Sequence, residues 1–215
     1  MTHCVGAREA STGEPSEKQS PARSSPQILG HVDYVVRRIR RENWSLLREL
    51  RLAALCDTPL GFLESYDVAR LHDDDEWRFR ADRGTWGGRS ATFVAEAADG
   101  TWVGMMGAFV DEAVEPPATT ELRVATVVAV FVRPAWRGRE HAVAVRLLAA
   151  VEGWARAEAA AAGLRLQVHE DNARALAFYR RMGFVETGDR EPYELDPTRS
   201  ELEMVRPLSA TAPRR

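Results

Sequence analysis

The sequence has almost no lysine and no excess of positive charge. Lys18 is the only lysine among 29 basic residues in a chain of 215, so arginine supplies the other 28. So one-sided a usage indicates a compositional bias rather than selection at one site. Acidic residues number 32, which leaves a net charge of −3. General nucleic-acid binders and anionic-membrane binders need a basic excess, so we expect neither partner.

Cysteine and long apolar runs are scarce as well. Cys4 and Cys56 are the only cysteines, and two widely separated thiols cannot form a disulfide framework. No run approaches the ~18–20 apolar residues that a membrane helix needs, and residues 1–27 lack the apolar core of a signal peptide. These absences predict a soluble, cytoplasmic protein with reduced thiols.

The two ends of the chain differ in composition from the middle. Residues 1–27 are rich in Ser, Pro, Gly and charge and poor in large apolar groups, and residues 209–215 look similar. Such segments bury too little apolar surface to offset the entropy lost on ordering, so we expect a disordered N-terminal tail and a C-terminal tail. Between them we expect one domain over residues 32–208, a length that suits a single domain.

The middle of the chain alternates between strand patterns and helix patterns. Runs rich in β-branched residues predict strands, and apolar residues at helical spacing predict helices. The expected strands are Val32–Ile39, Ala91–Ala97, Trp102–Val110, Val124–Val132, Leu164–Val168, Phe184–Thr187 and Glu201–Arg206. The expected helices are Glu42–Leu55, one from Asp73 through Phe79, Ala142–Ala161 and Asn172–Met182.

The second half of this pattern predicts the topology. The Val-rich run Val124–Val132 carries no charge, as expected of a central strand covered on both faces. It follows a loop, Glu112–Thr120, and precedes the long helix, which we expect Gly163 to cap. That helix leads to Leu164–Val168 as a crossover between parallel strands. The sequence therefore predicts an α/β fold with a mixed sheet.

The turn after Val132 is the first candidate binding site. Residues 128–148 read VAVFVRPAWRGREHAVAVRLL, which predicts a strand, an arginine-rich turn and a helix. The start of a helix offers unpaired backbone N–H groups and the positive end of the helix dipole, which suit a pyrophosphate. Arg137 and Arg139 could add charge-assisted contacts. A plain surface connection is the alternative interpretation.

A second motif follows, where residues 170–184 read EDNARALAFYRRMGF. Together with the turn, it resembles the GNAT superfamily of acetyl-CoA-dependent N-acetyltransferases. That family has an (Arg/Gln)-x-x-Gly-x-(Gly/Ala) turn and, after a helix and a strand, Asn-x-x-Ala-x-x-x-Tyr-x-x-x-Gly-Phe. The chain matches at Arg137, Ala142, Asn172, Ala175, Tyr179, Gly183 and Phe184. The resemblance implies a GNAT domain over residues 32–208, with a mixed β-sheet flanked by helices and a splayed parallel strand pair that holds the cofactor.

The resemblance also implies which backbone groups hold acetyl-CoA. Those of Val130, Phe131 and Val132 would pair with the pantetheine arm like an added strand, and one of their amides would polarise the thioester carbonyl. Backbone N–H groups of the turn would hold the pyrophosphate, and its residues are Arg137, Gly138, Arg139, Glu140, His141 and Ala142. No metal is expected.

Two side chains of the second motif complete the implied site. Asn172 would hydrogen-bond the pantetheine where the strands splay; its alternative role is a helix N-cap, and the two roles are compatible. Tyr179 lies seven residues, or two helical turns, further on. Its phenol would donate a proton to the departing thiolate. The alternative for Tyr179 is a half-buried core tyrosine beside Phe178.

One position departs from the family pattern, because the turn glycine falls at Glu140. Glycine serves where a backbone takes a positive φ or approaches a ligand closely. Glu140 adds a Cβ and a negative charge near two phosphates, which should weaken binding unless the side chain turns outward. It could pair with Arg137, Arg139 or His141. We expect Glu140→Gly to tighten acetyl-CoA binding.

The acceptor side depends on the region between the first two helices, which shapes the acceptor site in this family. Here residues 59–77 read PLGFLESYDVARLHDDDEW. Glu64 and Asp67 are the acidic candidates to attract a cationic amine, and Glu64 is the candidate catalytic base. We interpret the run Asp73–Glu76 as solvated and capping residues.

Other candidate bases are weaker. The strand position where several relatives carry a catalytic glutamate falls on Thr126, and Glu121 lies near the start of that strand. His169 could relay protons, but a plain strand-end histidine is favoured. His72, with the acids after it, lacks the ligand spacing of a closed zinc site.

The expected function is direct acetyl transfer from acetyl-CoA to a primary amine in a ternary complex. A small-molecule amine is favoured over a protein N-terminus or lysine. No cysteine falls within the motifs, which agrees with the absence of an acyl-enzyme. The alternative is a non-catalytic or weakly active CoA-binding regulatory module, which Glu140 and Thr126 favour and Asn172 and Tyr179 oppose. Because relatives dimerise in several ways, a homodimer is compatible with the sequence.

Overall fold

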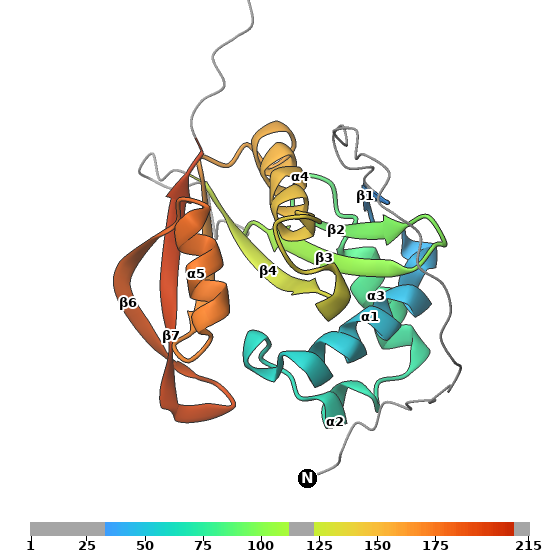
Figure 1. The fold of residues 1–215 in the computed structure, drawn as a ribbon, viewed down its shortest axis with the longest axis horizontal. Coiled ribbons are helices and arrows are strands. Elements are labelled where there is room, and N and C mark those ends of the chain that lie inside the picture. The colour runs from blue at the N-terminus through green and yellow to red at the C-terminus, as the bar shows by residue number, and fades with distance from the viewer. Residues whose placement is uncertain (1–32, 112–122, 209–215) are drawn as a thin grey trace, which may run out of the picture. The chain divides into compact units, whose positions relative to one another are not determined.

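The computed structural model describes residues 33–111 and 123–208 (Figure 1). The two expected tails, the loop Glu112–Thr120 and the candidate Glu121 lie outside these ranges. Within them, no helix is long and apolar enough to cross a bilayer.

The described residues form seven strands and five α-helices in the order that the sequence predicts, with one short helix added. The elements are β1 Tyr34–Arg38, α1 Trp44–Asp57, α2 Tyr66–Ala69, α3 Asp74–Arg83, β2 Ser90–Ala97, β3 Trp102–Phe109, β4 Val124–Val132, α4 Val143–Ala157, β5 Gly163–His169, α5 Ala173–Arg181, β6 Val185–Tyr193 and β7 Asp196–Pro207. The added helix is α2, a single turn whose N-cap is Ser65.

The strands form one mixed sheet in the order β1-β2-β3-β4-β5-β7-β6. Neighbours are antiparallel except β4 and β5, which are parallel and joined through α4. The predicted parallel crossover is therefore confirmed. This parallel pairing is short, because it joins only Val124–Thr126 to Gly163–Arg165. Beyond Thr126 the two strands separate, and the backbone of β4 has no strand partner on that side among the described residues.

A bulge on the other side of β4 adds to this separation. Gly107 of β3 lies opposite Val128, whereas Met105 lies opposite Phe131, so β4 has one residue more than β3 between these pairs. Ala129 lies in this interval with a φ of +54°. An extra residue of this kind bends a strand and increases its twist, so the second half of β4 turns away from the line of β5.

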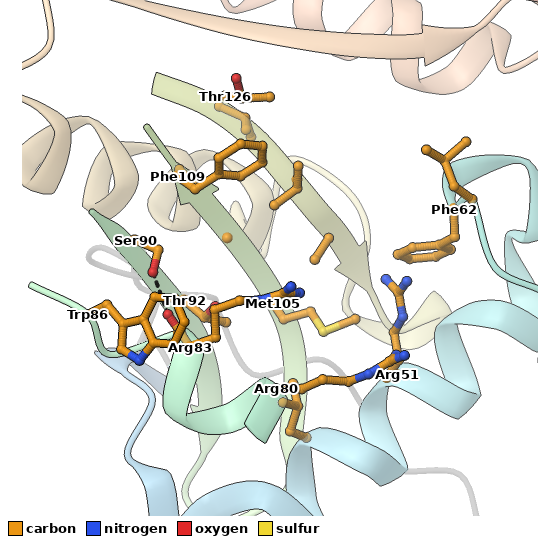
Figure 2. A pocket seen from close by; sticks show the side chains of 18 of the residues that line it. Arg51, Phe62, Arg80, Arg83, Trp86, Ser90, Thr92, Met105, Phe109 and Thr126 are labelled. Atoms are coloured by element: carbon orange, nitrogen blue, oxygen red, sulfur yellow. Dashed lines mark hydrogen bonds between the residues drawn. The ribbon is translucent and has the colours of Figure 1, made fainter. Parts of the chain in front are cut away.

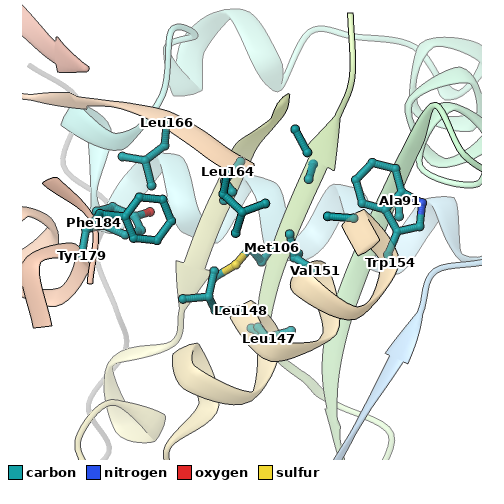
Figure 3. Close-up of a cluster of buried hydrophobic side chains, with 14 of the residues drawn as sticks. Ala91, Met106, Leu147, Leu148, Val151, Trp154, Leu164, Leu166, Tyr179 and Phe184 are labelled. Carbon is teal, nitrogen blue, oxygen red and sulfur yellow. The ribbon is translucent and has the colours of Figure 1, made fainter. Parts of the chain in front are cut away.

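Helices cover both faces of the sheet. On one face α4 buries Leu147, Leu148, Val151 and Trp154 against the sheet (Figure 3). The apolar residues at helical spacing that predict this helix form its buried face. On the other face α1 and α3 bury Leu50 and Trp77 in a second cluster with strand residues such as Met105. Figure 1 shows α4 and the α1–α3 group on opposite sides of the central strands.

Three local expectations were wrong. Gly163 does not cap α4, because the helix ends at Ala157 and Gly163 begins β5. β4 is not covered on both faces along its length: Val128 is 39% exposed, because cavities open beside this part of the strand. Strands β6 and β7 also extend beyond the predicted Phe184–Thr187 and Glu201–Arg206, since they form one long hairpin.

Candidate active site

A cavity of about 720 Å³ occupies the opening where β4 and β5 separate. We call it the splay cavity. Its walls come from the second half of β4, the end of β5, the start of α4 and the inner face of α5, and they include Val130, Tyr179 and Asn172. Residues that are far apart in the sequence thus meet where β4 and β5, within the described residues, are no longer paired.

Val130, Phe131 and Val132 line this cavity as the sequence predicts. Unpaired strand backbone can hydrogen-bond an extended ligand as if the ligand were a further strand. The carbonyl of Val132 already accepts a hydrogen bond from Nε of Arg137 at 2.7 Å. The backbone groups that β4 offers to a ligand therefore exclude that one carbonyl.

The turn before α4 lies at one end of the splay cavity. Arg137, Gly138, Arg139 and Ala142 line it, whereas Glu140 and His141 do not. Ala142, the N-cap of α4, has a φ of +52° and no side chain caps the helix. The first-turn residues Val143–Val145 also line the cavity. A helix start with its N–H groups uncapped is a suitable anion site.

The arginines of this turn have different roles. Arg137 forms an ion pair with Asp57 at the end of α1, so its charge is partly neutralised. Although burial alone would raise the pKa of Asp57, its hydrogen bonds with Thr58 and Arg137 lower it. Arg139 is exposed and has no ion pair within the described residues. Arg174, which the sequence analysis missed, lines the same cavity, and burial followed by the charge of Arg137 lowers its pKa.

Glu140 turns away from the splay cavity. Its carboxylate lies against Gly138, in the space where a side chain at that position would begin. Gly138 has a φ of +119°, so this position requires glycine for its backbone as well. The expected pairing of Glu140 with Arg137, Arg139 or His141 does not occur within the described residues, and Glu140 is exposed. The outward orientation that would limit its effect on a phosphate is therefore present.

Asn172 has the geometry of a helix cap with an unused donor. Its Oδ1 accepts a hydrogen bond from the backbone N–H of Ala175 at 3.1 Å. Its side-chain amide nitrogen has no acceptor within the described residues, and the residue lines the splay cavity. The N-cap role is thus present, and an N–H donor remains for a ligand.

Tyr179 is both a core residue and a wall of the splay cavity. It is 5% exposed. Its ring makes edge-to-face contacts with Phe178 and Phe184, whose ring centroids lie 5.2 and 5.5 Å away. Its hydroxyl makes no hydrogen bond with another described residue. Burial raises the pKa of this phenol above its ordinary value. The group therefore keeps its proton at neutral pH.

A second cavity of about 570 Å³ lies next to the first (Figure 2). We call it the acceptor-side cavity. The two share the walls Gly61, Val127–Ala129, Gln167 and Glu201. Phe62, Trp77, Met105 and Phe109 give it an apolar interior, and arginines line it too. Two ligands could therefore meet at the bulged part of β4.

Glu64, the expected base, does not line either cavity. Its carboxylate is held by Arg80 at 2.8 and 2.9 Å and by His72 at 2.7 Å. Although burial opposes the shift, these partners lower the pKa of Glu64 to about 2. A carboxylate with so little affinity for a proton is a poor base at neutral pH, so the geometry argues against the expected role.

Asp67 and Asp73 line neither cavity, whereas Thr126 lines the acceptor-side cavity and His169 lines the splay cavity. Asp67 pairs with Arg70 at 3.1 Å on the surface, and Asp73 is the N-cap of α3, as the capping interpretation predicts. The hydroxyl of Thr126 accepts from Arg165 at 3.1 Å. His169 is 2% exposed, and its Nδ1 accepts from the backbone N–H of Asp171.

Glu201 is a residue that the sequence analysis missed. It lines both cavities, on β7 opposite His169. Burial raises the pKa of its carboxyl, and Glu191 and Glu194 raise it further, while His169 acts in the opposite direction. No sequence motif marks it, because its place depends on the pairing of β7 with β5. Within the described residues, no cluster of three or more His, Cys, Asp or Glu side chains is placed to hold a metal ion.

Comparison with known proteins gives the class of this molecule. The model of the acetyltransferase (GNAT) family matches residues 47–184. The chain belongs to this family and is an acyltransferase of the N-acetyltransferase type. Curated protein sequences gave no significant match.

Solved structures agree on the fold. A GNAT-family acetyltransferase from Streptococcus pneumoniae matches with a TM-score of 0.67 at 16% identity, covering 82% of this chain and 99% of that one. YncA from Salmonella typhimurium, determined with acetyl-CoA, gives 0.62 at 16%, covering 85% and 98%. Spermidine N-acetyltransferase from Vibrio cholerae, with CoA and spermine, gives 0.61 at 16%, covering 83% and 98%. At these identities the likeness shows the fold alone.

Proposed function

We propose that this protein transfers the acetyl group of acetyl-CoA to a primary amine of a small molecule, directly and in a ternary complex. The observation that carries the proposal is the junction of two cavities at Val127–Ala129. Acetyl-CoA in the splay cavity and an amine in the acceptor-side cavity would meet there. The acetyl-CoA complex of the similar Salmonella protein supports the choice of donor.

Different residues of the splay cavity would bind different parts of acetyl-CoA. The uncapped start of α4, with Arg139 and Arg174, would hold the pyrophosphate. The free amide N–H of Asn172 would donate to the pantetheine, and the unpaired backbone of Val130 to Val132 would pair with it. This division follows from the groups that the fold leaves without partners.

The chemical step needs a polarised carbonyl, a neutral amine and a protonated leaving group. A backbone N–H of β4 next to the bulge would stabilise the negative charge that develops on the thioester oxygen. Glu201, at the junction and with a raised pKa, would accept the proton of the amine directly or through water. Tyr179 would give its proton to the CoA thiolate as the C–S bond breaks. No cysteine of the described residues lines either cavity, which suits transfer without an acyl-enzyme.

Release of the CoA thiol from acetyl-CoA, measured with a panel of amines, tests this function. We expect release that depends on the amine, with the acetylated amine as product. Double-reciprocal plots of the initial rate against one substrate, at several concentrations of the other, should give intersecting lines, as expected of a ternary complex. Binding of acetyl-CoA with no amine-dependent release would instead support the alternative, a CoA-binding module without turnover. Acetylation confined to peptides would support a protein acetyltransferase.

A further inference from the structure

Arginines outnumber acidic residues on the walls of the acceptor-side cavity. Among the described residues that line it, one is an acid, Glu201, and four are arginines: Arg51, Arg80, Arg83 and Arg89. The whole chain has a net charge of −3, so this local excess does not reflect the average. A concave apolar site with one sign of charge concentrates ligands of the opposite sign.

The charge of Arg80 is already neutralised by two carboxylates. Its Nε donates to Glu76 at 2.6 Å, and its two terminal nitrogens donate to Glu64. The same Glu64 carboxylate also contacts His72 at 2.7 Å. Arg80 acts as part of the wall rather than as a free binding group.

Arg51 shares the carboxylate that Arg80 already holds. Its guanidinium lies 3.6 Å from Oε2 of Glu64, which is longer than an ordinary hydrogen bond. Its carbon Cζ lies 4.0 Å from the ring centroid of Phe62. The pKa of Arg51 is lowered to about 10, chiefly by burial; Glu64 opposes this shift, and the charges of Arg80 and Arg83 add to it. The surroundings of Arg51 thus disfavour its positive charge, and an added anion would relieve them.

Arg83 is less neutralised than Arg51 and Arg80. It lies in the last turn of α3, and no carboxylate of the described residues is within ion-pair distance of its guanidinium. Figure 2 shows Arg83 extending towards Met105, while Arg51 rises from the other side towards Phe62. Met105 and Phe62 are apolar walls of the cavity beside these two guanidiniums.

The opposite end of the same cavity is acidic. Glu201 lies at the junction with the splay cavity, where the amine must be during transfer. We propose that the acceptor is a zwitterion, an amine that also carries a carboxylate or a phosphate, bound with its anionic group at Arg51 and Arg83 and its amine at Glu201. The proposal rests on the proposed function and specifies its substrate class. A polyamine without an anionic group would place positive charge beside the guanidiniums of Arg51, which only shares a carboxylate, and of Arg83, which has none within ion-pair distance among the described residues.

Matched acceptors test this assignment with the intact enzyme. Thiol release is measured for phenylalanine against phenylalaninamide, and for β-alanine and O-phosphoethanolamine against ethanolamine, with spermidine as a cation without an anionic group. In each set we expect the anionic member to have the higher kcat/KM, by about tenfold or more, since a hydrogen bond to a charged group contributes about that factor. The higher of β-alanine and O-phosphoethanolamine identifies the anionic group as carboxylate or phosphate.

Variants locate the effect. Arg83→Gln should reduce the preference for the anionic acceptor about tenfold, mainly through KM, and Arg83→Glu should reverse it in favour of spermidine. Arg78→Gln is the matched control, because Arg78 is on the same helix, pairs with Asp75 at 2.8 Å and does not line the cavity. It should keep the preference. Equal kcat/KM within the pairs, or a preference that Arg83→Glu does not change, would overturn the proposal.

A binding measurement separates this proposal from the proposed function. In titration calorimetry, N-acetylphenylalanine and N-acetylphenylalaninamide are titrated into the CoA-loaded protein. The difference between their affinities measures recognition of the anionic group without turnover. Tighter binding of the acid, lost in Arg83→Gln, would support the anion site even if no amine were acetylated. Turnover of neutral amines and spermidine with no preference for the acid in either measurement would keep the proposed function and overturn the anion site.

Discussion

Both oxygens of the Glu64 carboxylate accept hydrogen bonds from the guanidinium of Arg80, at 2.8 and 2.9 Å. This pair joins the loop before α2 to α3 and forms the wall behind the acceptor-side cavity. His72 adds a third contact to the same carboxylate. The residue that the sequence presents as a base therefore has a structural role in the fold.

The first prediction concerns stability. Glu64→Gln should lower the free energy of unfolding at pH 7 by about 2 kcal/mol, because it leaves charged partners half-buried without their anion. The pKa of Glu64 is lowered from its usual 4.5 to about 2, so its contribution is full above pH 4.5 and falls as the pH drops towards 2. The gap between wild type and variant in thermal or urea unfolding should thus narrow below pH 4.5. Asp67→Asn, at an exposed surface pair, is the control and should change little.

The second prediction concerns the proton donor. Tyr179→Phe should lower kcat for acetyl transfer by about 100-fold, a usual effect of losing a general acid. Acetyl-CoA affinity and folding should be retained, because the hydroxyl makes no hydrogen bond within the described residues and the ring contacts with Phe178 and Phe184 remain. Tyr66→Phe, outside both cavities, is the matched control. An unchanged kcat in Tyr179→Phe would remove the donor role.

The third prediction separates charge from shape at Glu140. The residue does not have a positive φ, in contrast to Gly138 and Ala142, so its backbone does not require glycine. We expect Glu140→Gln and Glu140→Gly to tighten acetyl-CoA binding alike, by about two- to fivefold, because each removes a negative charge near the phosphates. Calorimetry at low and high salt measures this. If only Glu140→Gly tightened binding, the effect would come from the Cβ and not from the charge. Weaker acetyl-CoA binding by both variants would contradict the prediction.

The fourth prediction concerns the base. Glu201 has a raised pKa, so kcat should fall as the pH drops through that value and the carboxyl gains the proton that it must accept from the amine. Glu201→Gln should lower kcat at neutral pH. It should also remove the fall of kcat at acidic pH, which is the acidic limb of the plot of kcat against pH. Glu203→Gln on the same strand, which lines neither cavity, should keep the limb. An unchanged profile in Glu201→Gln would point to water as the acceptor.

The sequence predicted the elements whose apolar pattern is strong. Both ends of the strand Val124–Val132 were predicted correctly, because a valine-rich run without charge is typical of a buried strand. The long helix was recognised from its stripe, but its end was misplaced by four residues, since alanines continue the pattern past the true end at Ala157. The β6–β7 hairpin was underestimated because nearly all of β6 is exposed and shows no alternation.

The splay cavity and the acceptor-side cavity differ in what the sequence could show. Asn172 and Tyr179 lie in one contiguous motif, so their shared helix face follows from spacing. The bulge at Ala129 has no sequence signal, because alanine seldom adopts a positive φ and nothing in the run marks it. Arg51, Arg83 and Glu201 come from three separate elements and meet only when the sheet and helices have formed.

Single-turnover transfer tests the central claim, that acetyl moves directly from acetyl-CoA to an amine at the junction of the two cavities. The enzyme is mixed with acetyl-labelled acetyl-CoA, and the label on protein and on amine is measured by rapid quench, first without and then with the preferred acceptor. We predict no label on the protein and no CoA release until the amine is added, followed by one acetylated amine for each CoA released. Labelled protein that forms before the amine is present, or CoA release that does not depend on the amine, would contradict direct transfer.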